Sequence, residues 1–71
     1  MITAIVFVHA EVARISEIAE EIAALDGVSE VYSVTGEIDL VALVRVHTHE
    51  QIAEVVADRL NKVEGVLDTE T

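Results

Sequence analysis

An internal repeat with a period of 38 residues is the feature that most restricts how this chain can fold. ITAIVFVH (Ile2 to His9) aligns with LVALVRVH (Leu40 to His47), and IAALDGVSE (Ile22 to Glu30) aligns with LNKVEGVLD (Leu60 to Asp68). Each copy reads as an apolar strand, a helix, and an acid-Gly-Val step that leads into a second strand. The repeat therefore predicts two βαβ units within 71 residues.

The spacing of apolar residues separates strands from helices within each unit. The first strand of each unit, Ile2–His9 and Leu40–Val46, is apolar at successive positions, as expected of a central strand. After each strand, apolar residues recur at helical spacing and mark one face of a helix. These helical positions are Ile15, Ile18, Ala19, Ile22 and Leu25 in the first unit and Ile52, Val55, Val56, Leu60 and Val63 in the second.

Further signals mark the ends of the helices and the turn between the units. Thr48 and Gln51 have the spacing of a capping box just before the second helix. Gly27 and Gly65 follow the two helices, where a residue with a left-handed backbone is expected. Gly36, the remaining glycine, falls in the predicted hairpin turn between the units.

Two βαβ units joined by a hairpin predict an α+β fold of the ferredoxin-like βαββαβ type. Right-handed crossovers place both helices on one face of a four-stranded antiparallel sheet, with the two long strands side by side at its centre. The even-numbered residues of these strands are apolar, and we expect them to lie under the helices. They are Ile2, Ala4, Val6, Val8, Ile38, Leu40, Ala42, Val44 and Val46.

The odd-numbered face of the central strands has no helix left to cover it. Ile5, Phe7, Val41 and Leu43 would form a larger apolar patch than a soluble monomer usually exposes. We therefore expect the sheet of a second copy to pack there, in an assembly of the dimeric α+β barrel type, through Ile5, Phe7, Val41, Leu43 and Arg45. The alternative is a solvated sheet face with scattered apolar residues, on which Arg45 is also solvated.

Length and charge restrict the possible functions further. A single domain of this size is marginally stable alone, and without cysteine it has no disulfide or cysteine-ligated metal to support it. Four Lys and Arg face fourteen Asp and Glu, so we expect no direct binding to nucleic acid or to an anionic membrane. We also expect a cytoplasmic protein, because no apolar run approaches the length of a membrane-spanning helix. No cofactor is expected.

Two short motifs then resemble a known family. VYSVTGEIDLVALVRV (Val31 to Val46) contains V-T-G-x-x-D-L, and the chain ends with E-G-V-x-x-T-x-T (Glu64 to Thr71). Both are similar to the ligand-binding domain of the Lrp/AsnC, or feast/famine, transcription regulators, which is often called the RAM domain. The resemblance covers nearly the whole chain, from Ile2 to Thr71, and identifies residues 1–71 as a single RAM-like domain for effector binding and oligomerisation.

The resemblance implies more than the spacing does. Members of the family dimerise through their sheets, and the dimers assemble further into tetramers or octamers. Amino-acid effectors bind between dimers, near the turn that matches Val34–Asp39, and the ligand state shifts assembly and DNA binding. A typical member also has a helix-turn-helix domain, which this sequence lacks, so it resembles a stand-alone form that would act on full-length Lrp/AsnC regulators.

The turn Val34–Asp39 has the chemistry that an amino acid requires. Asp39 can accept the ammonium group, Gly36 lets backbone N–H groups approach a carboxylate, and Thr35 adds a hydroxyl. Thr69 and Thr71 join the predicted site through the family resemblance, from a neighbouring subunit. The predicted ligand-binding residues are Val34, Thr35, Gly36, Glu37, Asp39, Thr69 and Thr71.

Each of these residues also has a simpler interpretation. Asp39 would bond to neighbouring backbone N–H groups, Gly36 would serve only the turn, and Glu37 would be solvated. Tyr32 contributes ordinary packing, or it contacts a ligand or a partner sheet, because its strand does not alternate cleanly. The acids on the helices, which include Glu17, Glu20, Glu21, Glu54 and Asp58, are expected to be solubilising surface.

The histidines support a different function. His9 and His47 occupy equivalent repeat positions, so we expect them to end neighbouring strands on one face, with His49 and Glu11 close by. Such a cluster would hold a divalent metal or perform acid–base chemistry. The simpler alternative is a set of solvated strand-end histidines, which are common next to turns, and no residue pattern marks a nucleophile.

Three functions follow from these observations. The leading hypothesis is a non-enzymatic effector-binding domain of the Lrp/AsnC type, which forms a dimer or a higher homo-oligomer, binds a small amino acid and modulates transcription. The second is an ACT-like amino-acid-sensing module that acts on a metabolic enzyme. The third is a small dimeric α+β barrel enzyme that uses His9 and His47.

Overall fold

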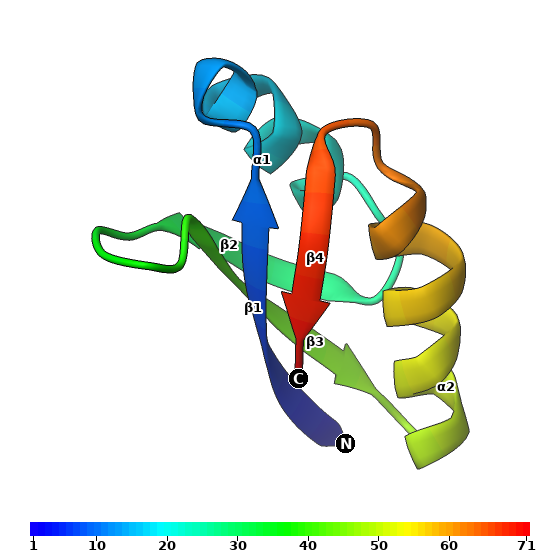
Figure 1. Ribbon diagram of the computed structural model, residues 1–71. Coiled ribbons are helices and arrows are strands. Elements are labelled where there is room, and N and C mark those ends of the chain that lie inside the picture. The colour runs from blue at the N-terminus through cyan, green and yellow to red at the C-terminus, as the bar shows by residue number, and fades with distance from the viewer.

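The two βαβ units follow one another along the chain in the structure, a computed structural model that describes residues 1–71 (Figure 1). The elements in order are β1 (Ile2–Ala10), the 3-10 turn η1 (Val12–Arg14), α1 (Ile15–Ala23), β2 (Val28–Ser33), β3 (Leu40–Val46), α2 (His49–Ala53), the π-helical segment η2 (Glu54–Arg59), the 3-10 turn η3 (Leu60–Lys62) and β4 (Val66–Glu70). This order confirms the predicted βαββαβ pattern.

The four strands form one antiparallel sheet in the order β2-β3-β1-β4. The two long strands, β1 and β3, therefore lie at its centre, as predicted, and Val8 faces Leu40 at one end while Ile2 faces Val46 at the other. The sheet, together with two helices, confirms the ferredoxin-like fold.

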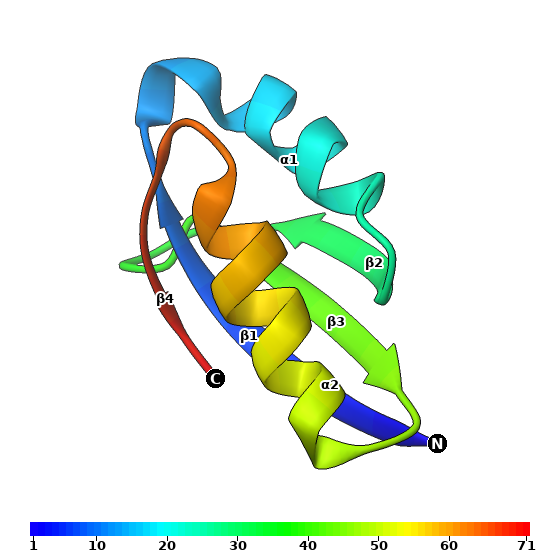
Figure 2. The same cartoon turned by 90° about the vertical axis from the view of Figure 1, so that its right-hand side faces the viewer.

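Both helices lie on the same face of the sheet (Figure 2). The core between these layers comes from the even-numbered residues of β1 and β3, among which Val6, Val8 and Leu40 are completely buried. Ile18 and Ile22 of α1 and the second helix complete this core from the other layer. The predicted helix-covered face is therefore confirmed.

The helix ends differ in detail from the sequence pattern. The first helix begins with the short turn η1, and α1 proper starts at Ile15. The second passes through α2, η2 and η3, so its turns widen and then tighten between residues 49 and 62. The predicted capping box is present: the Gln51 N–H donates to the Thr48 hydroxyl over 3.3 Å, and the Gln51 side chain accepts from the Thr48 N–H over 3.1 Å.

Two glycines hold the helices close to the sheet. Gly27 and Gly65 have φ angles of 95° and 98°, the left-handed backbone that was predicted. A Cβ atom would lie 2.5 Å from a side-chain carbon of Val55 at Gly27, and 2.5 Å from one of Ile18 at Gly65. Only glycine permits both this backbone and this approach.

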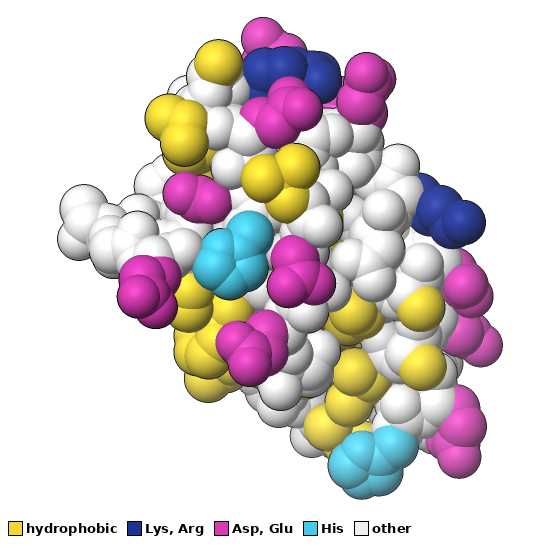
Figure 3. Space-filling view, in the orientation of Figure 1, with side chains coloured by type: hydrophobic (Ala, Val, Ile, Leu, Met, Phe, Trp, Pro, Cys, Tyr) yellow, Lys and Arg dark blue, Asp and Glu magenta, His cyan; other side chains and the backbone are white.

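The opposite face of the sheet is free of helices and is partly apolar. Ile5 lies opposite Leu43 and Phe7 lies opposite Val41, so the register gathers four apolar side chains into one patch. Ile5 is 53% exposed, and the other three are half-buried. In Figure 3, hydrophobic side chains reach the surface at the left of the view as well as over α2 at the right, among many acidic ones. We call Ile5, Phe7, Val41 and Leu43 the open apolar patch.

Candidate functional site

The turn between β2 and β3 projects beyond the sheet (Figure 1). A hydrogen bond from the Val34 N–H to the Asp39 carbonyl, 3.1 Å long, closes it. Gly36 has a φ of 108° with no atom near the position of a Cβ, so this glycine serves the turn without a packing constraint. Thr35, Gly36 and Glu37 are exposed, and their polar groups are therefore accessible from outside.

Asp39 connects this turn to the end of β1. Its Oδ2 accepts the backbone N–H of Ala10 over 2.9 Å, and its own N–H donates to the Val8 carbonyl over 3.1 Å. The register of β1 against β4 shifts between His9 and Ala10, so the carboxylate satisfies a donor at an irregular point of the sheet. A carboxylate has two acceptor oxygens, and Oδ1 makes no hydrogen bond within the chain.

The two threonines of the predicted site lie away from this turn. Thr69 lies opposite Val8, a residue of the helix-covered face, and its hydroxyl donates to the Asn61 side-chain oxygen over 2.9 Å. Thr71 is exposed just after the end of β4. One chain therefore brings Val34 to Asp39 together but not Thr69 and Thr71, whose contribution from a neighbouring subunit stays a prediction.

The predicted histidine cluster is wrong. β1 and β3 are antiparallel, so His9 lies at the end of the sheet where Leu40 begins β3, and His47 lies at the other end, beyond the Ile2–Val46 pair. Because a strand advances about 3.3 Å per residue, they are roughly 25 Å apart. No three His, Asp or Glu side chains are grouped as metal ligands. In an antiparallel pair only the equivalent positions near the middle meet, as Ile5 and Leu43 do, and those at the strand ends lie far apart.

Tyr32, whose direction the sequence left open, and Arg45, which was predicted on the outer face, both belong to the uncovered side of the sheet. Tyr32 lies opposite Val41 beside the open apolar patch, and its hydroxyl donates to the Glu30 carboxylate. This hydrogen bond and the charge of Glu30 raise the pKa of Tyr32 above its ordinary value of 10.0. Arg45 is exposed and has no carboxylate partner in its own chain.

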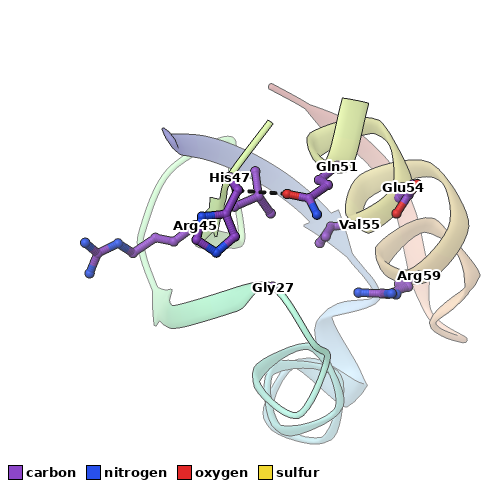
Figure 4. Close-up of a pocket in the computed structure, with 8 residues that line it drawn as sticks. Gly27, Arg45, His47, Gln51, Glu54, Val55 and Arg59 are labelled. Carbon is purple, nitrogen blue, oxygen red and sulfur yellow. Dashed lines mark hydrogen bonds between the residues drawn. The ribbon is translucent and has the colours of Figure 1, made fainter. Parts of the chain in front are cut away.

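Sequence reasoning missed a hollow at the His47 end of the sheet. It has a volume of about 210 Å³ and lies between the end of β3, the second helix and the turn after α1 (Figure 4). Its lining residues are Gly27, Arg45, Val46, His47, Gln51, Glu54, Val55 and Arg59. These residues come from three separate segments of the chain, so no local sequence motif predicts the hollow.

Comparison with known proteins gives one consistent answer. The family model for the Lrp/AsnC ligand-binding domain matches residues 3–71. A stretch of 55 residues, 78% of this chain, is 46% identical to an uncharacterised HTH-type transcriptional regulator of Pyrococcus horikoshii and covers 37% of it. A similar regulator of Pyrococcus furiosus is 34% identical over 70 residues, which are 99% of this chain and 47% of the relative. The chain thus spans less than half the length of these relatives.

Solved structures agree with this relationship. A protein of Thermus thermophilus superposes with a TM-score of 0.93 at 47% identity, over 99% of this chain and 88% of that one. A Neisseria meningitidis transcriptional regulator, solved in complex with L-Met, shares the fold with a TM-score of 0.83 at 23% identity, over 96% of this chain and 46% of the regulator. None of the helices in the present chain is long and apolar enough to cross a membrane. The chain belongs to the Lrp/AsnC family, as a ligand-binding domain.

Proposed function

We propose that this domain self-associates through its sheet, binds a small amino acid next to Asp39, and passes the ligand state to transcription regulators. The family supports the regulatory role, because the matched relatives are HTH-type transcriptional regulators. The L-Met complex of the Neisseria regulator supports an amino acid as the ligand. The net charge of −10 disfavours direct contact between this domain and DNA.

The observation that carries this proposal is the free oxygen of Asp39. The Ala10 N–H holds Oδ2 in place, so the carboxylate is pre-positioned while Oδ1 remains available to an ammonium group. Thr35 and the backbone N–H groups around Gly36 supply donors for the carboxylate of the same ligand. Charge-assisted bonds of about 1.5–3 kcal/mol each make binding in the micromolar-to-millimolar range attainable with a few contacts.

Self-association follows from the open apolar patch. Leu43 and Val41 are half-buried in one chain, and Ile5 is 53% exposed, so a second sheet would remove further apolar surface from water. Each 100 Å² of apolar surface buried contributes about 2.5 kcal/mol, which is large beside the marginal stability of so small a domain. Arg45, at one end of this face, would meet acids of the second copy.

Ligand binding is tested by thermal unfolding of the chain with each of the twenty amino acids in turn. We expect at least one amino acid to raise the midpoint, and Asp39→Asn to reduce this rise, since asparagine keeps a side-chain oxygen for the Ala10 N–H but loses the negative charge. Asp58→Asn, at an exposed helix position, is the matched control. Failure of all twenty to shift the midpoint would contradict the proposal.

Self-association is tested by sedimentation velocity over a range of dilution. Ile5→Arg places a charge in the open apolar patch and is expected to shift the protein to single chains. Val12→Arg is the control, because Val12 is 79% exposed on η1, outside the sheet. A folded single chain at all concentrations before any substitution would remove this part of the proposal.

The regulatory role is tested by co-purification of the tagged domain from cells that contain a helix-turn-helix regulator of this family. We expect the regulator to bind the domain, and the saturating amino acid found by thermal unfolding to change the amount recovered. Recovery of a metabolic enzyme in place of a regulator would favour an amino-acid sensor that acts on catalysis.

A further inference from the structure

Two side chains with hydrogen-bond donors, Gln51 and Arg59, line the hollow at the His47 end of the sheet. Gln51 accepts the His47 N–H over 2.8 Å and the Thr48 N–H over 3.1 Å through its Oε1. These two donors fix the orientation of the amide, because only its oxygen can accept them. The Gln51 amide nitrogen is therefore turned toward the hollow, below the dashed bond to His47 in Figure 4.

Arg59 supplies a positive charge on the opposite side of the hollow. Its guanidinium donates to the Asp26 carbonyl over 2.9 Å, which restrains the side chain while most of its five N–H groups stay free. No carboxylate lies within ion-pair distance of Arg59, although the chain has fourteen acids; the ion pairs of the structure all involve Arg14. Arg59 thus faces the hollow with an unneutralised charge.

Two other lining residues have different roles. Arg45 extends away from Gln51 and Arg59, so its guanidinium lies outside the hollow (Figure 4). Glu54 is the single carboxylate in the lining, and it is exposed. It opposes the binding of an anion without blocking it, since it forms no ion pair with Arg59.

We propose that this hollow binds a small oxyanion, a phosphate or a carboxylate, between the Gln51 amide and the Arg59 guanidinium. The volume of about 210 Å³ has room for such a group, and an amide N–H and a guanidinium are donors that oxyanion oxygens accept. The inference is independent of the proposed amino-acid site, because Asp39 precedes β3 while the hollow lies where β3 ends.

The test is an NMR titration of the ¹⁵N-labelled chain with sodium phosphate and, in a second arm, with sodium succinate, at an ionic strength held constant with sodium chloride. We expect saturable shifts of the Gln51 side-chain amide and the Arg59 Nε–H signals in at least one arm, and that arm identifies the oxyanion. Shifts that do not saturate in either arm, or that spread evenly over the chain, would overturn the proposal.

Two charge variants are expected to change oxyanion affinity in opposite directions. Arg59→Gln is expected to weaken binding about tenfold. Arg14→Gln removes the same charge from a residue that does not line the hollow, and is expected to leave binding nearly unchanged. Glu54→Gln is expected to strengthen binding roughly twofold, with Glu20→Gln as its control. Equal effects of a variant and its control would overturn the proposal. If Arg59→Gln impairs folding, the Gln51 and Arg59 NMR signals of the unsubstituted chain still test whether the oxyanion binds in the hollow.

Discussion

The two faces of β1 and β3 are both rich in apolar residues, yet one chain covers only one of them. Val6, Val8, Leu40 and Val44 on the helix side are completely buried, whereas Ile5 on the other side is 53% exposed. Both helices are already used on the first face (Figure 2). The difference teaches that this fold completes its core on one side of the sheet and leaves an apolar surface uncovered on the other side.

The largest expected effect tests this difference directly by comparing two leucines of β3. Leu40→Ala should lower the free energy of unfolding by about 3 kcal/mol at every protein concentration, because it empties a site that the chain itself closes. The loss from Leu43→Ala should grow with protein concentration, because under the proposed self-association a second copy would complete the burial of this side chain. Chemical unfolding across a dilution series measures both. If the loss of unfolding free energy in Leu43→Ala does not depend on protein concentration, the proposed difference between the two faces is contradicted.

The next effect compares a glycine under the helices with one in the open turn. Gly65→Ala should cost about 2–3 kcal/mol, because a Cβ there meets Ile18 at 2.5 Å and the φ of 98° is strained for alanine. Gly36→Ala should cost only about 1 kcal/mol, since its φ of 108° is strained but the space is open. Thermal unfolding of the two variants at one concentration tests the order, and equal losses would contradict it.

A smaller effect concerns Asp39, which joins the open turn to β1. Asp39→Asn should lower the free energy of unfolding by about 1 kcal/mol, because a neutral amide oxygen accepts the Ala10 N–H less strongly than a carboxylate. Asp58→Asn should change it by less than about 0.5 kcal/mol. Urea unfolding at neutral pH measures both variants. If both losses are equally small, Asp39 is not a structural link between the turn and β1.

The smallest expected effect is on the pKa of Tyr32, which lies beside the open apolar patch. The Glu30 carboxylate raises the pKa of Tyr32, so tyrosinate absorbance should appear above pH 10.0 and move back toward it in Glu30→Gln, but not in Glu20→Gln. Because the pKa is raised on folding, the contact contributes stability below pH 10.0 that is lost as pH rises through the folded value. A midpoint at or below 10.0 in the unsubstituted chain would contradict this contact.

Much of the fold was predictable because it depends on local patterns. The alternation of β3 predicted which residues lie under the helices, and Leu40, Ala42 and Val44 are indeed completely buried. The spacing of Thr48 and Gln51 predicted the capping box, since a cap involves residues within one helical turn. Positive φ at the glycines was predictable for the same reason.

The candidate site was less predictable, because its contacts join residues that are distant in the sequence. The motif placed Asp39 at the mouth of β3, but the hydrogen bond to Ala10 depends on how β1 lies against the turn. Thr69 was predicted beside an effector bound to a neighbouring subunit, which stays a prediction, and its hydroxyl contact with Asn61 within the chain had no signal in the sequence. The hollow between Gln51 and Arg59 left no signal in the sequence.

The sequence alone determined the repeat, the order of strands and helices, the face of the sheet that the helices cover, and the family. These follow from periodicity and short motifs, which residue order records directly. Only the tertiary structure decided which side chains meet: it separated His9 from His47, joined Asp39 to Ala10 and formed the hollow beside Arg59. The reason is that such contacts depend on strand register and helix placement, and packing of the whole chain sets both.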